Sequence, residues 1–544
     1  MSKNLLYYGD NLEILRRYIE DESVDLVYLD PPFNSNQDYN VLFAERSGTK
    51  SAAQIKAFED TWRWDLGAEE AFREVVETGG PVSEAMQAFR TFLGESDMMA
   101  YLAMVAPRLV ELRRVLKGTG SIYLHCDPTA SHYLKMLLDA VFGPGCFRNE
   151  IVWKRTNARS TRGKWPRVHD VILYYGASKR AMFDPVSVPG DPAKLPHTLV
   201  TGPDGRKYQS YELTAAGTRN GPSGEEWRGF DPGSKGRHWS NVPETLEEWD
   251  AKGLIHWPRS GGFPRRRAEK PFVASSRTVF VGDVWTDIDR INQSAKERLG
   301  YPTQKPEELL ERILQASSKE GHVVLDPFCG CGTTIAAAQN LERNWIGIDI
   351  THLAVALIKH RLQSTFGSEA QFEVVGEPVS LPDAKELAAE DPFQFQWWAL
   401  GLVGARPVEQ KKGADKGIDG RLYFHEKPTG GDTKQIVLSV KAGKLQAQHV
   451  RDLRGVIERE KAAIGVLISM AKPTKAMRAE AASAGFYESE FAKGKYPRMQ
   501  LLTVEELLGG KRIECPPHHT NVSLKSAPKA RKKSRPHPKL FDHE

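Results

Sequence analysis

Short apolar runs alternate with stretches of helical periodicity along most of the chain. Near the N-terminal end, residues 5–10 and 24–30 are apolar runs of strand length, separated by a segment with helical spacing. A long helical stretch is expected from 83 to 116, and residues 121–127 and 169–176 again have the composition of buried strands. Strands that alternate with helices are typical of a parallel sheet covered on both faces, so the pattern predicts an α/β fold.

The periodicity fades between 181 and 271, where Gly, Pro, Trp and Arg are frequent. This stretch is interpreted as an inserted module. Helix and strand alternation returns after it, so the core is expected in two parts, 1–180 and 272–375. The remaining predicted parts are a linker, a smaller second α/β unit and a basic disordered tail, at 376–390, 391–512 and 513–544.

Composition and charge narrow the class of protein. The chain has 544 residues, of which 40% are hydrophobic and 27% charged, as in folded globular proteins. The net charge is +5, and the last 29 residues, with seven Lys or Arg and two Asp or Glu, account for all of it, so any basic binding surface must be local. We expect neither a membrane span nor a signal peptide. Five scattered cysteines favour a reducing, cytoplasmic location.

A glycine-rich loop, DPFCGCGTT at 326–334, joins an apolar run to a helical segment. Gly330 and Gly332 allow a ligand to approach the backbone closely. Asp349 ends the next predicted strand, 23 residues after Asp326, where a Rossmann-like unit places an acid for ribose hydroxyls. A tight turn without a ligand is the alternative for such a loop taken alone. The two cysteines of the loop lack a second pair at zinc spacing, so no metal is expected there.

A second motif, Asp30-Pro31-Pro32-Phe33, follows the apolar run at 24–30. Its two prolines make a rigid turn that presents a carboxylate, a carbonyl and an aromatic ring together. Two acceptors and a ring face suit a planar base with an exocyclic amine. A helix-capping aspartate beside a core phenylalanine is the alternative, and the presence of both motifs in one chain weakens it.

Together these motifs resemble those of the amino-group DNA methyltransferases, which have a Rossmann-like fold and use S-adenosyl-L-methionine. The family's catalytic (D/N/S)PP(Y/F/W) motif is matched at 30–33, and its cofactor motif at 326–334. The catalytic motif comes first, and 181–271 stands where the family has its target-recognition region, which resembles the permuted β group. Three further family segments are matched, at 7–11, 120–127 and 300–306.

The resemblance implies a site-specific DNA methyltransferase of the restriction–modification type that acts on N6 of adenine in duplex DNA. Aspartate in the first catalytic position favours adenine; cytosine N4 is the rival target, and a DNA-binding protein with an inactive methyltransferase fold is the third hypothesis. The implied catalytic residues are Asp30, Pro31, Pro32 and Phe33, of which Phe33 would stack on the flipped base. The implied cofactor-binding residues are Asp10, Thr303, Lys305, Asp326, Phe328, Gly330, Gly332, Thr333 and Asp349.

Residues 151–168 contain six basic side chains and no acid, so they would neutralise several phosphates of double-stranded DNA. These side chains are Lys154, Arg155, Arg159, Arg162, Lys164 and Arg167. Arginines of the inserted module are further candidates for phosphate or guanine contacts, namely Arg237, Arg259 and Arg265 to Arg267. A homodimer is kept as an additional hypothesis about partners.

The second unit carries a different set of polar residues. Ser439 and Lys441 lie two apart on a predicted strand, so their side chains point to one face, and Asp419 precedes that strand. The pattern resembles the Mrr-like branch of the PD-(D/E)xK nucleases, where Asp419 and Lys441 would be the metal-binding acid and the lysine. Ser439 replaces the usual Glu or Gln and is a weak ligand for Mg²⁺. A Mg²⁺ site at Asp419, with Glu409 as a further ligand, and an inactive nuclease-like domain both stay open. The basic cluster at 529–533 is either a DNA tether or a solubilising end.

Overall fold

The computed structural model describes most of the chain and divides it into two compact units, Met1–Asp184 with Gly282–Glu544, and Pro185–Val281. The described residues are 4–32, 64–189, 199–258, 261–272, 278–292, 295, 297–299, 301, 303–408, 417–425, 433–489, 494–516 and 520–521. No helix within these ranges combines the length and apolar character needed to cross a membrane.

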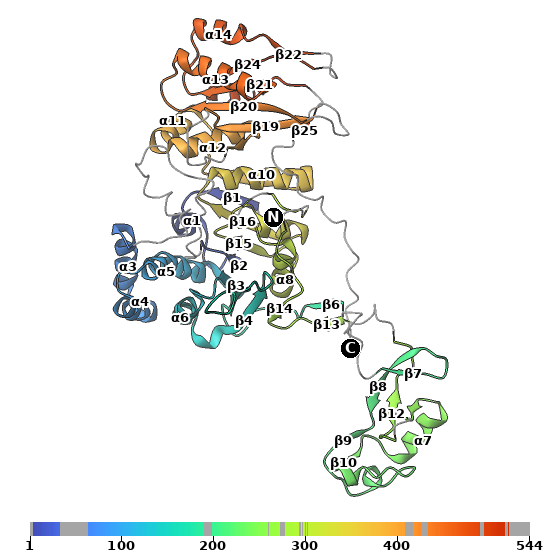
Figure 1. Ribbon diagram of the computed structural model, residues 1–544. Coiled ribbons are helices and arrows are strands. Elements are labelled where there is room, and N and C mark those ends of the chain that lie inside the picture. Colours follow the sequence, from blue (N-terminus) through green and yellow to red (C-terminus); the bar gives the residue numbers. More distant parts are fainter. Residues whose placement is uncertain are drawn as a thin grey trace. The chain divides into compact units, whose positions relative to one another are not determined.

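The largest sheet among the described residues has nine strands (Figure 1). All of its strands run the same way except β5, which is antiparallel to both of its neighbours. The predicted α/β fold is therefore confirmed, with one reversed strand. In spatial order the strands are β14 (Val284–Trp285), β4 (Phe147–Lys154), β5 (His169–Gly176), β3 (Leu116–Cys126), β2 (Val24–Leu29), β15 (Val323–Asp326), β16 (Asn344–Asp349), β1 (Asn4–Tyr8) and β17 (Phe372–Val375).

Helices cover both faces of this sheet, and the apolar side chains between the layers form its core. Figure 1 shows the blue helices α3, α4 and α5 on one side of the sheet and α8 on the other. The helices of this part are α1 (Asn11–Tyr18), α3 (Leu66–Thr78), α4 (Gly80–Leu93), α5 (Asp97–Val115), α6 (Ser131–Phe142), α8 (Glu307–Ser317), α9 (Thr333–Asn340) and α10 (His352–Phe366).

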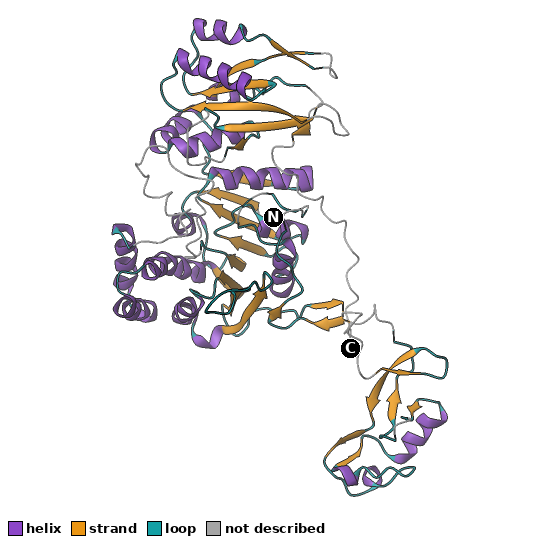
Figure 2. Ribbon diagram, viewed as in Figure 1, coloured by secondary structure: helices purple, strands orange, loops and turns teal. Residues whose placement is uncertain are grey.

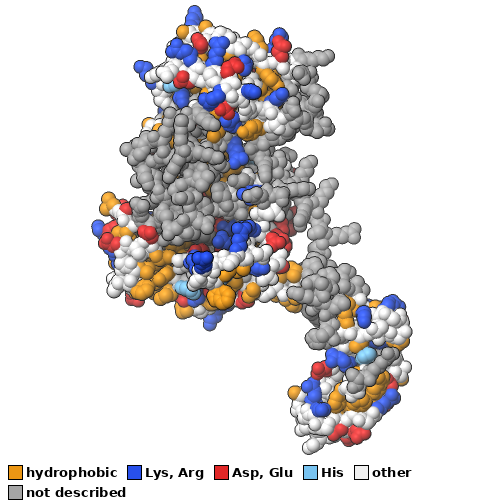
Figure 3. All heavy atoms as spheres, in the orientation of Figure 1, with side chains coloured by type: hydrophobic (Ala, Val, Ile, Leu, Met, Phe, Trp, Pro, Cys, Tyr) orange, Lys and Arg blue, Asp and Glu red, His pale blue; other side chains and the backbone are white. Residues whose placement is uncertain are grey.

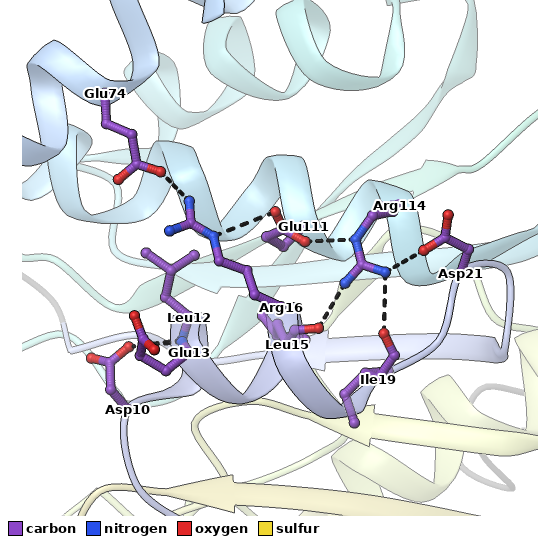
Figure 4. A network of polar contacts seen from close by, with 10 residues as sticks. All are labelled: Asp10, Leu12, Glu13, Leu15, Arg16, Ile19, Asp21, Glu74, Glu111 and Arg114. Atoms are coloured by element: carbon purple, nitrogen blue, oxygen red, sulfur yellow. Dashed lines mark hydrogen bonds and ion pairs between the residues drawn. The ribbon is translucent and has the colours of Figure 1, made fainter.

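A network of ion pairs fixes α1 against α3 and α5 (Figure 4). Arg16 of α1 forms ion pairs with Glu74 and Glu111, and Arg114 of α5 pairs with Glu111 and Asp21. Arg114 also donates to backbone carbonyls at the end of α1, those of Leu15 and Ile19. The helix that begins directly after Asp10 is therefore held by charged contacts as well as by its apolar face.

Two predictions about secondary structure need correction. The helical stretch expected from 83 to 116 is two helices, because Gly94 has a left-handed φ of +61° and ends α4. The predicted linker at 376–390 instead contains the helix α11 (Leu381–Glu390). Ser380 and Asp383 form a capping box at its start, and Pro382 lies in the first turn, where no backbone donor is needed.

The C-terminal part of the first unit is a second α/β assembly with its own core. Its sheet has the order β18-β19-β20-β21-β24, with β25 also paired to β19. The first four of these strands are β18 (Arg406–Pro407), β19 (Gly420–His425), β20 (Thr433–Lys441) and β21 (Ile464–Ser469), and the others are β24 (Met499–Thr503) and β25 (Thr520–Asn521). A small hairpin, β22 (Phe486–Glu488) with β23 (Lys495–Pro497), stands apart from the sheet. Its further helices are α12 (Pro392–Leu402), α13 (Ala447–Arg459), α14 (Lys475–Ala482) and α15 (Val504–Leu508).

The inserted unit, Pro185–Val281, consists mainly of short strands (Figure 2). Its extent overlaps the predicted inserted module and reaches ten residues further at the C-terminal end. A small aromatic core built on Trp227 and Trp239 holds it together. The elements are β6 (Ser187–Pro189), β7 (Leu199–Thr201), β8 (Lys207–Glu212), β9 (Thr214–Ala216), β10 (Arg237–Trp239), α7 (Pro243–Ala251), β11 (Ile255–His256), β12 (Arg265–Arg267) and β13 (Thr278–Phe280).

Candidate active site

The two sequence motifs leave the sheet side by side. Strand β2 pairs in parallel with β15, with Leu26 opposite Val324 and Val27 opposite Leu325. The Asp30 turn and the glycine loop therefore begin at the same edge of the sheet, where α/β proteins bind their ligands. Phe33 lies outside the described residues.

Asp30 forms an ion pair with Lys305, which comes from the segment before α8. Only 16% of the Asp30 side chain and 13% of the Lys305 side chain are exposed. Lys305 was expected at the cofactor, but its ammonium group lies on the predicted catalytic carboxylate. Thr303, expected beside it in the cofactor site, is exposed on the same turn. Any amine that binds to Asp30 must share this carboxylate with Lys305.

The glycine loop joins β15 to α9 in the conformation that its sequence predicts. Gly330 and Gly332 have left-handed φ angles of +50° and +72°. A Cβ atom at Gly330 would lie 3.2 Å from the ring of Tyr301, and one at Gly332 would lie 2.7 Å from Ile358. The backbone conformation favours glycine at both positions, and at Gly332 a side chain would also force Ile358 to shift.

Two buried carboxyl groups flank this loop. Burial raises the pKa of the Asp326 carboxyl to about 7, against opposing hydrogen bonds from Thr334 and the Phe328 backbone. Burial also raises the pKa of Asp349 to about 6, although its Oδ2 accepts from the Gly330 backbone at 2.9 Å. Within the described part of the chain, neither carboxylate forms an ion pair. A ligand with positive charge and hydroxyl donors would satisfy both.

The other predicted cofactor residues have structural partners. Asp10 caps α1 and forms an ion pair with Arg108, 2.9 Å between Oδ2 and Nη2, yet 42% of its side chain is exposed. The Thr333 hydroxyl accepts a hydrogen bond from Arg361 at 3.2 Å, and Phe328 packs against the core. Sequence reasoning missed Arg108, although a charged residue within the apolar run of α5 was a usable signal.

A buried polar chain connects β2 with the predicted DNA-binding segment. The Tyr28 hydroxyl lies 2.9 Å from His125 Nδ1, and His125 Nε2 lies 3.3 Å from Asp170 Oδ2. Asp170 in turn forms an ion pair with Arg155, 3.2 Å from Oδ1 to Nε. The sequence contained a signal for it, a histidine and an aspartate within two apolar strands, but their pairing depends on strand order.

The basic segment 151–168 ends β4 and forms the connection to β5. Because β4 runs parallel to β2 and β5 runs against it, this loop emerges at the edge that holds Asp30. All six predicted basic side chains are exposed. Arg167 anchors the loop through Thr129, with a hydrogen bond of 3.0 Å. Figure 3 shows Lys and Arg side chains gathered on one face of this unit.

The arginines predicted as DNA contacts in the inserted unit have partners within it. Arg237 pairs with Glu212 and Arg265 donates to Ser210, while Arg266 and Arg267 lie over the rings of Trp249 and Tyr208. Arg259 lies outside the described residues. The exposed basic side chains of 151–168 therefore match the expected phosphate-binding surface better than the arginines of the inserted unit do.

The predicted nuclease-like residues come together in the C-terminal sheet. The Ser439 hydroxyl donates to Asp419 Oδ2 at 3.0 Å, and Lys441 Nζ lies 3.7 Å from the same oxygen. The Val440 backbone also donates to it. No group of three His, Cys, Asp or Glu side chains suited to a metal occurs among the described residues, and Glu409 lies outside them. The Asp419 carboxylate is occupied by neighbouring donors.

Comparison with known families and proteins agrees with both sequence resemblances. Residues 24–360 match the N6_N4_Mtase family model, described as DNA methylase. Residues 394–509 match the NACHT-associated inactive Restriction Endonuclease 1 model, which gives no support to a Mg²⁺ site at Asp419.

Two relatives and one solved structure each match about two thirds of the chain. The Type II methyltransferase M.EcaI of Enterobacter cloacae is 30% identical over 361 residues, 66% of this chain and 69% of that protein. The Mod subunit of the Type III restriction-modification enzyme StyLTI of Salmonella typhimurium is 24% identical over 391 residues, 69% of this chain and 56% of the subunit. The Thermus thermophilus protein TTHA0409, solved with S-adenosyl-L-methionine, is 16% identical with a TM-score of 0.34, covering 69% of this chain and 99% of that one.

The methylase model spans more than half of the chain, and the motifs that carry it leave one edge of the main sheet. The protein therefore belongs to the N6/N4 DNA methylase family, as a DNA methyltransferase of the restriction–modification type with a C-terminal domain of the inactive restriction endonuclease type.

Proposed function

We propose that the protein transfers a methyl group from S-adenosyl-L-methionine to the exocyclic N6 of adenine at a specific site in double-stranded DNA. The observation that supports this most is the adjacency of β2 and β15, whose ends carry Asp30 and Asp326. The aspartate of the catalytic motif favours adenine over cytosine.

The chemistry of the glycine loop fits the cofactor. When bound, S-adenosyl-L-methionine supplies an electrophilic methyl carbon on a cationic sulfur. Asp349 would accept the ribose hydroxyls, and Asp326 would lie near the positively charged end. A Cβ at Gly330 would lie 3.2 Å from the ring of Tyr301, so glycine favours the close approach of the loop to this ring. Asp10, with its half-exposed carboxylate, is assigned to the adenine end of the same site.

The Asp30 turn would activate the target amine. The lone pair of an exocyclic amine is delocalised into the base, which makes the nitrogen a poor nucleophile. Hydrogen bonds from its two N–H groups to Asp30 and the Pro31 carbonyl would favour a pyramidal nitrogen and aim the lone pair at the methyl carbon. Phe33 is assigned as the stacking surface for the flipped base. Lys305 would keep the Asp30 carboxylate neutralised until the amine arrives.

Duplex DNA would be held by the basic segment and read by the inserted unit. The basic side chains of segment 151–168 are exposed, the segment lacks acids, and its connection to β5 lies at the edge that carries Asp30. Contacts to phosphates position the duplex without reading its sequence. Sequence recognition is therefore assigned to the unit Pro185–Val281.

Mass spectrometry of nucleosides tests this function directly. Methyl-free DNA made by enzymatic amplification is incubated with the protein and with S-adenosyl-L-methionine carrying a deuterated methyl group, and then digested to nucleosides. Labelled N6-methyldeoxyadenosine is the expected product. Labelled N4-methyldeoxycytidine would select the rival base, and no labelled nucleoside from DNA of diverse sequence would favour the inactive, DNA-binding alternative.

A further inference from the structure

One side chain of the C-terminal domain forms hydrogen bonds with the turn that follows β16 of the methyltransferase sheet. Gln394 in the first turn of α12 is fully buried. Its Oε1 accepts a hydrogen bond from the His352 backbone at 3.0 Å, and its Nε2 donates to the Ile350 carbonyl at 3.3 Å. The glutamine therefore clasps the turn between β16 and α10 from both sides.

The clasped turn directly follows the acid assigned to the cofactor ribose. Asp349 Oδ1 accepts from the Thr351 backbone and hydroxyl, at 3.0 and 2.8 Å, while Oδ2 accepts from the Gly330 backbone. Movement of residues 350–352 would thus rotate the Asp349 carboxylate and release the glycine loop. Gln394 therefore contacts the residues on either side of Thr351, which itself holds the Asp349 carboxylate.

Helix α12 is itself rigidly held, so it can act as a support. Phe395, Trp398 and Leu400 from the same helix lie in the core of the C-terminal domain. On its other side α12 packs against α10, where a Cβ at Gly401 would be 3.3 Å from the Ala356 methyl group. Helix α12 therefore joins the core of the C-terminal domain to helix α10, and its Gln394 reaches the turn that precedes α10.

We propose that the C-terminal domain, which matches an inactive nuclease family, braces the cofactor site, with Gln394 as the positioning residue. This rests on the proposed assignment of S-adenosyl-L-methionine to the glycine loop. Two hydrogen bonds, one to each side of the turn, restrain the segment that orients Asp349. Positions held by such supporting contacts keep a binding group in its productive geometry without touching the ligand.

The full-length variant Gln394→Met tests the brace, because it keeps the side-chain volume and loses both hydrogen bonds. Gln500→Met is the matched control. Gln500 is also buried in the C-terminal domain, and it accepts from the Glu514 backbone at 2.8 Å and donates to the Glu514 and Pro497 carbonyls. Both variants lose hydrogen bonds of a buried amide, but of the two residues it is Gln394 that contacts the turn after β16.

We expect Gln394→Met to raise the dissociation constant for S-adenosyl-L-methionine roughly tenfold, as for the loss of buried hydrogen bonds, and to speed amide hydrogen exchange at His352 and Gly330. Its kcat at saturating cofactor should stay within about threefold of the parent. Gln500→Met should lower thermal stability and leave the cofactor affinity within about twofold. Equal affinities for the cofactor in Gln394→Met and Gln500→Met would overturn the brace. If Gln394→Met does not fold while the control does, Gln394→Glu replaces it, because glutamate keeps the acceptor to His352 and loses the donor to Ile350. A cofactor affinity of Gln394→Glu equal to that of the parent would then overturn the brace. A parent protein that does not bind the cofactor would instead remove the proposed function, and the brace with it.

Discussion

Cofactor binding should release protons below neutral pH, because Asp326 is about half protonated at pH 7 in the free protein and mostly protonated at pH 6. Its carboxyl is buried, and burial raises the pKa to about 7. A carboxyl with this pKa is protonated in about nine of ten molecules at pH 6 and in about one of ten at pH 8. A cationic ligand favours the carboxylate, so binding should drive the proton off.

The magnitude follows from that pKa. The Asp326 carboxyl should release about 0.9 proton per bound S-adenosyl-L-methionine at pH 6 and about 0.1 at pH 8. Through this group, the affinity for S-adenosyl-L-methionine should be about tenfold lower at pH 6 than at pH 8. Asp349, whose pKa burial raises to about 6, would add up to about half a proton at pH 6.

Isothermal titration calorimetry in buffers of different ionisation enthalpy measures the released protons. Asp326→Asn should lose most of the release at pH 6, while Asp349→Asn, the matched control, should keep the larger share. If the parent and Asp326→Asn release the same number of protons at pH 6, the assignment of Asp326 to the positive end of the cofactor is wrong.

Three further perturbations test separate parts of the structure. Gly332→Ala should lower the free energy of unfolding by about 1–3 kcal/mol in urea titrations, since a left-handed φ and a 2.7 Å contact both oppose a Cβ; Gly236→Ala, at a glycine with the same left-handed backbone conformation and open space around its Cβ, should cost less. Arg162→Ala should reduce the slope of log affinity for DNA against log salt by about one, and an unchanged slope would remove it from the phosphate surface. His125 and Arg155 lower the pKa of Asp170 although burial opposes them, so its contribution to stability is present above its unfolded pKa and lost as the pH falls through the lower folded value; melting temperatures of Asp170→Asn should then depend less on pH below about 4.

Local sequence signals predicted much of the site. The apolar runs that became β2 and β15 each end in a motif with proline or glycine, and parallel strands bring such ends to one edge of a sheet. The left-handed conformations of Gly330 and Gly332 follow from the same local logic. The order of the strands, which makes β2 and β15 neighbours, has no local signal and came only with the fold.

Partners distant in sequence were beyond prediction. Lys305 meets Asp30 across 275 residues, and Arg108 meets Asp10 across 98. Each lysine or arginine in the sequence has many acids to choose from, and only the packed chain selects one. The hydrogen bonds of Gln394 could not be predicted for a further reason. An amide in a helix rich in aromatic residues gives no indication that it faces another domain.

We propose that Asp30 acts on the target amine in a site shared with the glycine loop. Single-turnover transfer of a labelled methyl group to duplex DNA, measured with the parent and with Asp30→Ala at saturating cofactor, tests it most directly. The rate of transfer should fall by about a hundredfold or more, while the dissociation constant for S-adenosyl-L-methionine stays within about threefold. Transfer by Asp30→Ala at the rate of the parent would contradict the claim.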